Sequence, residues 1–202
     1  MSPGAEPFVC GLVLAAGGSS RLGRPKQLLA FGPATLLDHT VRTARACRFD
    51  QLIVTVGGGA DEIRSRVDLS GVEVVQSPRY AEGCSSSIAA ALGAVSPQAD
   101  VLVLLLGDQP GVGPATVAAL LAGRGDADLA ICAYDDAPGH PFAFGRALLG
   151  ELGALRGDKG VWKLVARMGQ AVVRVPVPGP VPLDVDTWED YERVLAAAGA
   201  PT

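Results

Sequence analysis

Short apolar runs alternate with segments of helical periodicity along the first half of the chain. Continuous apolar runs are typical of strands buried on both faces of a sheet, and the runs that predict strands are residues 8–15, 51–56, 72–75 and 101–106. After the first of these runs, Leu37, Val41, Ala44 and Cys47 recur at the spacing of one helix face. The other segments that predict helices here are residues 85–95 and 114–121.

The second half of the chain repeats this alternation less regularly. It predicts strands at residues 129–134 and 171–177, and helices at residues 160–168 and 187–198. The stretch DDAPGHPFAF, residues 135–144, predicts a loop that runs into an edge strand. Together these elements predict an α/β fold whose mostly parallel sheet carries helices on both faces and ligands at the carboxyl ends of its strands. Because the sequence shows no internal repeat or linker, we expect a single domain over residues 1–202.

Composition narrows the possible partners. The chain has 202 residues, of which 49% are hydrophobic and 19% are charged, as expected for one globular domain. Its formal net charge of −4 disfavours broad binding to nucleic acid or to anionic membranes, because both need a surplus of Lys and Arg. The four cysteines form no CxxC pair, so they predict neither a zinc site nor a disulfide framework. We therefore expect no nucleic-acid partner and no membrane partner.

The N-terminal segment bears on the location of the protein. MSPGAEPF, residues 1–8, has no basic region of the kind that begins a secretory signal. The apolar run that follows is far shorter than the ~20 residues that a membrane-spanning helix needs. We therefore expect a cytoplasmic protein.

A glycine-rich basic loop follows the first predicted strand. Residues 14–26 read LAAGGSSRLGRPK, so Arg21, Arg24 and Lys26 stand beside glycines whose backbone N–H groups can approach an anion closely. The loop lacks the GxxxxGK[ST] pattern of a P-loop and the GxGxxG pattern of a dinucleotide-binding fold. It predicts a phosphate-binding loop, and the alternative is a solvated glycine turn.

Acidic residues follow a later strand and precede the last helix. Asp108 comes directly after the apolar run 101–106, where its carboxylate is expected at the ligand edge of the sheet. Asp184 and Asp186 are two residues apart, so an extended chain would point both to one side. Magnesium prefers one or two carboxylates together with phosphate oxygens, and Asp108 with Asp186 is the predicted pair. The alternatives are that Asp108 caps a turn and that Asp186 is a second helix-capping residue beside Thr187.

Six short motifs occur in one order over nearly the whole chain: LAAGGSSRLGRPK, AEGCSSSIAAAL, LLGDQP, PGHPFAF, GDKG and DVDTWEDY. In this order they resemble the nucleotidyltransferases that attach a nucleotide to molybdopterin, and most of all the molybdenum cofactor cytidylyltransferase branch. The resemblance implies a Rossmann-like fold, a nucleoside triphosphate substrate, Mg²⁺ and the release of pyrophosphate. It implies CTP in particular, because the cytidylyl branch reads LAAG where the guanylyl branch reads LAGG, a difference that rests on Ala16.

The same resemblance assigns residues to roles. It implies catalytic roles for Arg21, Lys26 and Asp108, and a metal held by Asp108 and Asp186. The residues it assigns to the nucleotide are Leu14, Ala15, Ala16, Gly17, Gly18, Ser19, Ser20, Arg21, Lys26, Ser85 and Asp108. The residues it assigns to the second substrate are Ser86, Gln109, His140, Gly157 and Asp158. From the residues alone, the serines are equally an N-cap cluster, and the loop at residues 157–160 is just a turn that enters a helix.

Two departures and several rival functions stay open. Ser77 and Tyr80 stand where the family commonly has Asn and Trp, so this chain departs from the family pattern at two positions that would contact the base or the pterin. The implied partners are CTP or another NTP, molybdopterin or molybdenum cofactor, and a molybdoenzyme of the xanthine or carbon monoxide dehydrogenase type. The alternatives are a transferase that uses GTP, one that acts on a sugar phosphate or another phosphorylated metabolite, and a non-catalytic module that hands on the cofactor.

Overall fold

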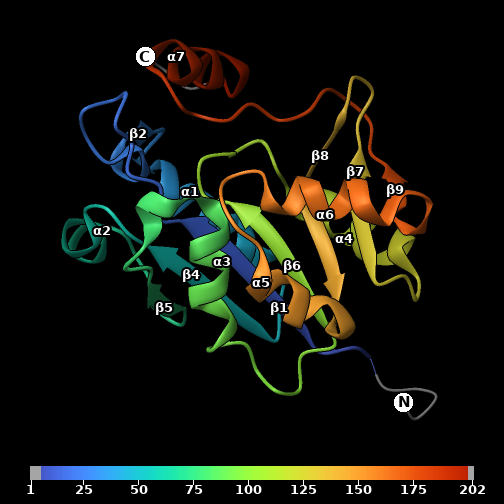
Figure 1. Cartoon of the computed structure of the whole chain (residues 1–202). Coiled ribbons are helices and arrows are strands. Elements are labelled where there is room, and N and C mark those ends of the chain that lie inside the picture. The colour runs from blue at the N-terminus through green and yellow to red at the C-terminus, as the bar shows by residue number, and fades with distance from the viewer. Residues whose placement is uncertain (1–5, 200–202) are drawn as a thin grey trace.

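The chain folds around a central seven-stranded sheet in a computed structural model that describes residues 6–199 (Figure 1). The strand order is β5-β4-β1-β6-β8-β7-β9. The strands are β1 (Val9–Ala15), β4 (Gln51–Val56), β5 (Glu73–Gln76), β6 (Val101–Leu106), β7 (Leu129–Ala133), β8 (Pro138–Gly145) and β9 (Val173–Pro176). A separate two-stranded hairpin pairs β2 (Ala30–Phe31) with β3 (Ala34–Thr35).

Most neighbouring strands are parallel, as the alternating pattern predicts. Strand β1 pairs in parallel with both β4 and β6, β4 pairs in parallel with β5, and β7 pairs in parallel with β9. The carboxyl ends of β1, β4 and β6 therefore meet along one edge of the sheet. The α/β fold with a mostly parallel sheet is thus confirmed.

Helices cover both faces of this sheet. One core layer packs α1 (Leu36–Ala46), α2 (Ala60–Arg66) and α4 (Pro114–Arg124) against one face, and the other packs α3 (Cys84–Leu92), α5 (Leu149–Ala154) and α6 (Gly160–Met168) against the opposite face. Along β1, Val13 faces the first layer and Leu12 the second, and both are fully buried. Burial on both faces explains why this strand is an unbroken apolar run.

The last helix, α7 (Trp188–Ala197), packs away from the sheet. Its Val194 and Leu195 join a third apolar cluster with Phe31 of the β2–β3 hairpin and Leu36 at the start of α1. The segment before α7 crosses the end of the sheet, and α7 itself lies beside the hairpin (Figure 1). The C-terminal part of the chain is thereby fixed next to the loop that follows β1.

The sequence-based expectation for residues 135–144 is wrong in one respect. Strand β8 is not an edge strand, because it lies between β6 and β7 and is antiparallel to both. Phe142 and Phe144 are fully buried in the second core layer, so β8 belongs to the interior of the fold. The local pattern gives the presence of a strand but not its neighbours, which are chosen by long-range packing.

Two short helices were not predicted. Helix α2 begins after Gly59, which has a φ of 74°, and α5 follows a 3-10 turn, Arg146–Leu148. Each has only seven or six residues, too few for a clear 3.6-residue period. Within residues 6–199, no helix combines the length and the apolar character that crossing a membrane requires. Residues 1–5 of the N-terminal segment judged above lie outside the described part.

Candidate active site

A cleft of about 910 Å³ opens at the carboxyl ends of the parallel strands. Its walls are the loop after β1, the segment around the start of α3, the turn after β6, and parts of β8, α6 and the segment before α7. Both the size and the position are those of ligand sites in open α/β sheets. The cleft is therefore the candidate active site.

The loop after β1 offers unpaired backbone N–H groups to this cleft. Within the described residues, the N–H groups of Gly17, Gly18, Ser19 and Ser20 donate to no protein acceptor. The buried side chain of Gln27 stabilises the loop by donating hydrogen bonds to the carbonyls of Ala15 (2.6 Å) and Gly17 (3.1 Å). A run of free N–H groups at a glycine loop is suited to an anion with several oxygen atoms.

Lys26 is tied to the same loop. Its backbone N–H donates to the Ser19 hydroxyl at 2.9 Å, and Ser19 itself has a left-handed backbone with a φ of 52°. A 3-10 turn, Lys26–Leu28, begins at this residue. The loop and its lysine therefore form one structural unit.

The Lys26 ammonium lies between two carboxylates that are distant in sequence. Its Nζ donates to Oδ2 of Asp108 in a close contact and to Oδ1 of Asp186 at 2.9 Å. The side chain of Lys26 is 12% exposed and that of Asp108 is 18% exposed, whereas that of Asp186 is 50% exposed. Arg21 also reaches Asp186, with Nη2 at 3.4 Å from Oδ2. The sequence-predicted cation and acid residues thus meet in one cluster.

Backbone contacts bring the C-terminal segment to the end of β6. The N–H of Val185 donates to the carbonyl of Asp108 at 3.1 Å, and the Gln109 side chain donates to the carbonyl of Pro182 at 2.7 Å. Thr187 then caps α7, with a capping box completed by Asp190. Asp186 is therefore not the capping residue, and its carboxylate is free to face Lys26.

The electrostatics of the cluster are uneven. Burial disfavours the charge on Lys26, yet the carboxylates of Asp108 and Asp186 hold its pKa above the usual range. The hydrogen bond from Lys26 lowers the pKa of Asp186. Asp184, which also lines the cleft, has no such partner, and burial together with the negative charge of Asp108 raises its pKa to about 6. The acidic end of the cleft thus carries more negative charge than Lys26 balances.

This donor set suits a divalent cation that binds together with phosphate. Within residues 6–199, no group of three or more His, Cys, Asp and Glu side chains is arranged to hold a metal ion by itself. Asp108 and Asp186 nevertheless direct oxygen atoms to one point, now filled by an ammonium. Magnesium is typically bound by one or two carboxylates, with phosphate oxygens and water completing the coordination. The two carboxylates therefore fit such an ion.

The opposite wall is built where a loop meets the start of α3. Oδ1 of Asp158 accepts from the N–H of Cys84 at 3.0 Å, and the carbonyl of Gly157 accepts from the Ser85 hydroxyl at 2.6 Å. Gly83, with a φ of 103°, lies so close that an added Cβ would stand 2.6 Å from the Asp158 carboxylate. The Ser86 hydroxyl donates to the carbonyls of Arg79 and Gly83. These hydroxyl groups are engaged in holding the wall, and Asp158 and Ser87 face the cleft.

Aromatic rings and a lysine lie near this wall. The His140 ring stacks on Phe142 with 4.2 Å between ring centroids, and Trp162 stands at 90° to Phe142. Burial lowers the pKa of His140 to about 4, so its ring is neutral at pH 7. Lys159, next to Asp158, lines the cleft and within the described residues forms no ion pair. This part of the cleft combines a flat apolar surface with one free cation.

The structure does not place all sequence-predicted residues on the cleft. Arg21 reaches the site through Asp186, while Gln109 is 3% exposed and holds the C-terminal segment. Sequence reasoning did not select Lys159, although its position within the GDKG motif was a usable signal. Tyr80 also lines the cleft, where its ring packs against Gly18. No signal in the sequence indicated that packing.

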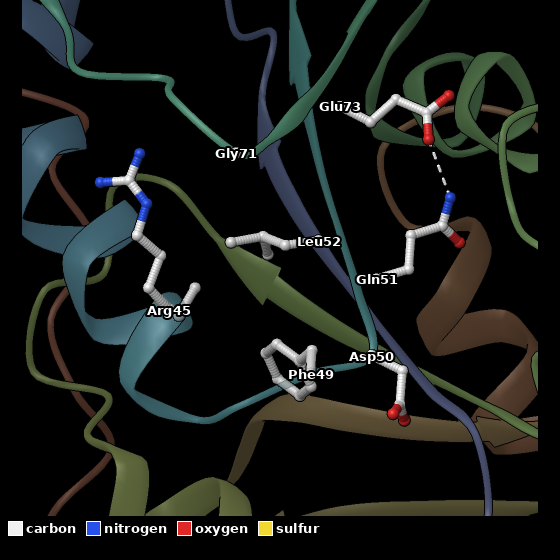
Figure 2. A pocket seen from close by; sticks show the side chains of 8 residues that line it. Arg45, Phe49, Asp50, Gln51, Leu52, Gly71 and Glu73 are labelled. Atoms are coloured by element: carbon white, nitrogen blue, oxygen red, sulfur yellow. Dashed lines mark hydrogen bonds between the residues drawn. The ribbon is translucent and has the colours of Figure 1, made fainter.

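A second, smaller hollow of about 330 Å³ lies near the amino end of β4 (Figure 2). Its polar groups are already paired: Gln51 donates to Glu73 at 2.8 Å, and Arg45 pairs with Asp68 at 3.1 Å. Figure 2 shows the Gln51–Glu73 bond across one side of the hollow and Arg45 on the other. The hollow therefore offers far less free polar chemistry than the cleft.

Comparison with known proteins gives one family. A family model described as the MobA-like NTP transferase domain matches residues 11–172. A nicotine blue oxidoreductase from Paenarthrobacter nicotinovorans is 31% identical and is aligned over 94% of this chain and 97% of its own. The molybdenum cofactor cytidylyltransferase of Escherichia coli is 29% identical over 68% of this chain and 70% of its own.

Solved structures resemble the whole fold. A homologue of Mycobacterium tuberculosis Rv0371c from Mycobacterium sp. strain JC1 is 52% identical, with a TM-score of 0.90 over 95% of this chain and 96% of its own. Rv0371c of Mycobacterium tuberculosis in complex with manganese is 45% identical, with a TM-score of 0.84 over 95% of this chain and 100% of its own. A relative of nearly the same length therefore binds a divalent metal.

Proposed function

Because the chain belongs to the MobA-like NTP transferase family, a family of nucleotidyltransferases, we propose that it transfers CMP from CTP to the terminal phosphate of molybdopterin or molybdenum cofactor and releases pyrophosphate. The acceptor and the base follow the similarity to molybdenum cofactor cytidylyltransferase. The whole chain would act as one transferase domain.

The observation that carries the proposal is the cluster of Lys26, Asp108 and Asp186 beside a loop with free N–H groups. A triphosphate has several anionic oxygens, and residues 17–20 offer donors for them. Lys26 stands at the end of the same loop, where it can neutralise the charge that builds up as pyrophosphate leaves. Arg21, on the far side of Asp186, adds a second cation.

The reaction needs alignment more than proton transfer. An oxygen of the acceptor phosphate forms a bond to the α-phosphorus of CTP, and the bond between that phosphorus and the bridging oxygen of the β-phosphate breaks. The nucleophile is already anionic, so no general base is required. The protein therefore works by holding two polyanions in line and by screening their repulsion.

Mg²⁺ is the proposed metal, and Asp108 and Asp186 would hold it. When bound, it would neutralise phosphate charge that the two lysines of the cleft cannot balance alone. The manganese complex of the relative supports a divalent ion of this kind. The carboxylates also fix the position of the Lys26 ammonium.

The acceptor would lie against the opposite wall. A flat heteroaromatic ring such as a pterin fits beside His140 and Trp162. Lys159 also lines the cleft and forms no ion pair within residues 6–199, and it would meet the acceptor phosphate. His140 is neutral at pH 7 and would contact substrate without transferring a proton. Asp158, bonded to the start of α3, keeps the Lys159 backbone in place.

The decisive experiment is product analysis with purified protein, Mg²⁺, molybdopterin and each of the four NTPs. The expected result is a CMP-linked pterin with one pyrophosphate released per product. A GMP-linked product would show that the nucleotide substrate is GTP and not CTP. Turnover with a sugar phosphate alone would show that the acceptor is not molybdopterin. Absence of pyrophosphate with every NTP and acceptor would favour the non-catalytic cofactor-handing role. The product would then be offered to an apo-molybdoenzyme of the xanthine or carbon monoxide dehydrogenase type.

A second candidate is suggested by the relative named nicotine blue oxidoreductase. The rings of His140 and Trp162, which line the cleft, would also accept a flat pigment. Such a reaction needs an electron donor, so the test is oxidation of NADH or NADPH in the presence of a planar quinone-like dye. Activity in this assay without pyrophosphate release would replace the transferase assignment.

A further inference from the structure

The Lys26 ammonium occupies the point at which two carboxylates would bind a metal ion. Nζ contacts Oδ2 of Asp108 closely and lies 2.9 Å from Oδ1 of Asp186. A divalent cation and this ammonium both need the same oxygen atoms. The Lys26 ammonium and a metal ion therefore compete for the carboxylates of Asp108 and Asp186.

Lys26 cannot leave the carboxylates without cost. Its side chain is 12% exposed, so an ammonium moved away from both acids would lose its counter-ions in a poorly hydrated place. A metal ion that binds Asp108 and Asp186 without a phosphate ligand must displace the Lys26 ammonium from both carboxylates. A triphosphate removes the difficulty, because its oxygens would replace the carboxylates as partners of the ammonium.

The loop links the two events. Lys26 is hydrogen-bonded through its N–H to Ser19, and residues 17–20 carry the free N–H groups that a triphosphate would bind. An anion bound on the loop therefore arrives next to the Lys26 side chain. Binding of the anion and release of the carboxylates occur within one structural unit.

We propose that Lys26 is an internal counter-cation that makes divalent-metal binding at Asp108 and Asp186 conditional on a bound triphosphate. The inference rests on the proposed use of a triphosphate at this loop. Linkage makes the effect reciprocal, so metal and triphosphate increase each other's affinity by the same factor. The protein would thus avoid holding the metal before its substrate is present.

The test measures Mn²⁺ binding by electron paramagnetic resonance, without any turnover. The variants are Lys26→Met, Lys26→Gln and the matched control Lys159→Met, which removes a cleft lysine that has no carboxylate partner in the described chain. Without any anion, the two Lys26 variants should bind Mn²⁺ at least tenfold more tightly than wild type. Lys159→Met should stay within about twofold of wild type. Thermal melting establishes that each variant is folded.

Tripolyphosphate then serves as the anion, since it tests the coupling without regard to base or acceptor. In wild type it should raise Mn²⁺ binding beyond the sum of binding by protein alone and by tripolyphosphate alone, and in Lys26→Met this excess should fall at least fivefold. Adding Asp108→Asn to Lys26→Met should abolish the gain in Mn²⁺ affinity. Equal affinities of wild type and the Lys26 variants, or an equal gain in Lys159→Met, would overturn the inference. Absence of pyrophosphate release would count against the proposed function and leave this result unchanged.

Discussion

Replacing Asp184 by Asn should make the protein more stable at neutral pH. Asp184 lines the acidic end of the cleft, and unlike Asp186 it receives no hydrogen bond from Lys26. Burial and the nearby charge of Asp108 raise its pKa to about 6. The substitution removes the charge and keeps the shape of the side chain. The folded protein then no longer has to hold an unpaired carboxylate.

The magnitude and its sign follow from the pKa. A rise from 3.8 to about 6 corresponds to about 3 kcal/mol at ~1.36 kcal/mol per pKa unit. The Asp184 side chain reaches solvent, so screening reduces the expected gain to about 1 kcal/mol. Because the pKa of Asp184 is raised in the folded state, the side chain is protonated in both the folded and the unfolded protein below pH 3.8. As the pH rises through about 6, Asp184 ionises in the folded protein and the wild type loses stability. The advantage of the variant should therefore be absent near pH 3.8 and complete above pH 7.

Urea denaturation in EDTA, at intervals from pH 4 to pH 8, measures this effect. Thermal melting in the same buffer at pH 7.5 should show the gain as an increase of roughly 2–4 °C in melting temperature for a chain of this size. Asp186→Asn is the matched control two residues away. Lys26 lowers the pKa of Asp186, so that variant should be less stable than wild type at neutral pH. A gain that is the same at pH 4 and pH 8, or the same sign for both variants, would refute the reasoning.

Three further predictions concern the two walls and the core. Ala16→Gly should reduce the preference for CTP over GTP, measured as the ratio of kcat/KM values, and an unchanged ratio would remove Ala16 from base selection. Asp158→Ala should cost about 1 kcal/mol in urea denaturation, because it removes the carboxylate that accepts a hydrogen bond from the start of α3. It should also raise KM for the acceptor substrate more than KM for CTP, and equal changes in the two KM values would exclude a role of Asp158 in binding the acceptor substrate. Phe142→Ala should cost about 3–5 kcal/mol because the ring is fully buried in the sheet, and a loss under ~1 kcal/mol in denaturation would contradict this packing.

The carboxylates gathered in the cleft lower the stability of the folded protein but suit the proposed function. Asp108, Asp184 and Asp186 face one cleft, and only Lys26 and the exposed Arg21 pair with any of them in the described chain. A protein selected for stability alone would not gather these carboxylates. The excess negative charge makes sense if a cation and its phosphate ligands complete the site.

Local pattern was enough to predict most of the fold. Strand β6 is a run of six apolar residues, and Pro114 marks the start of α4, so these elements follow from neighbours in the sequence. Short helices such as α2 have too few residues to show a period, and they were missed. The free N–H groups after β1 also follow from local sequence, because the glycines and the loop they form are contiguous.

Only the tertiary structure decided which charged side chains pair and which strands are neighbours. The sequence predicted that the loop lysine and two acids share the edge of a sheet, but only the fold inserts Lys26 between Asp108 and Asp186, 82 and 160 residues away along the chain. The same holds for β8, whose burial between β6 and β7 depends on partners distant in sequence. Hydrophobic period is a property of adjacent residues, whereas charge pairing and strand neighbours are properties of the packed chain.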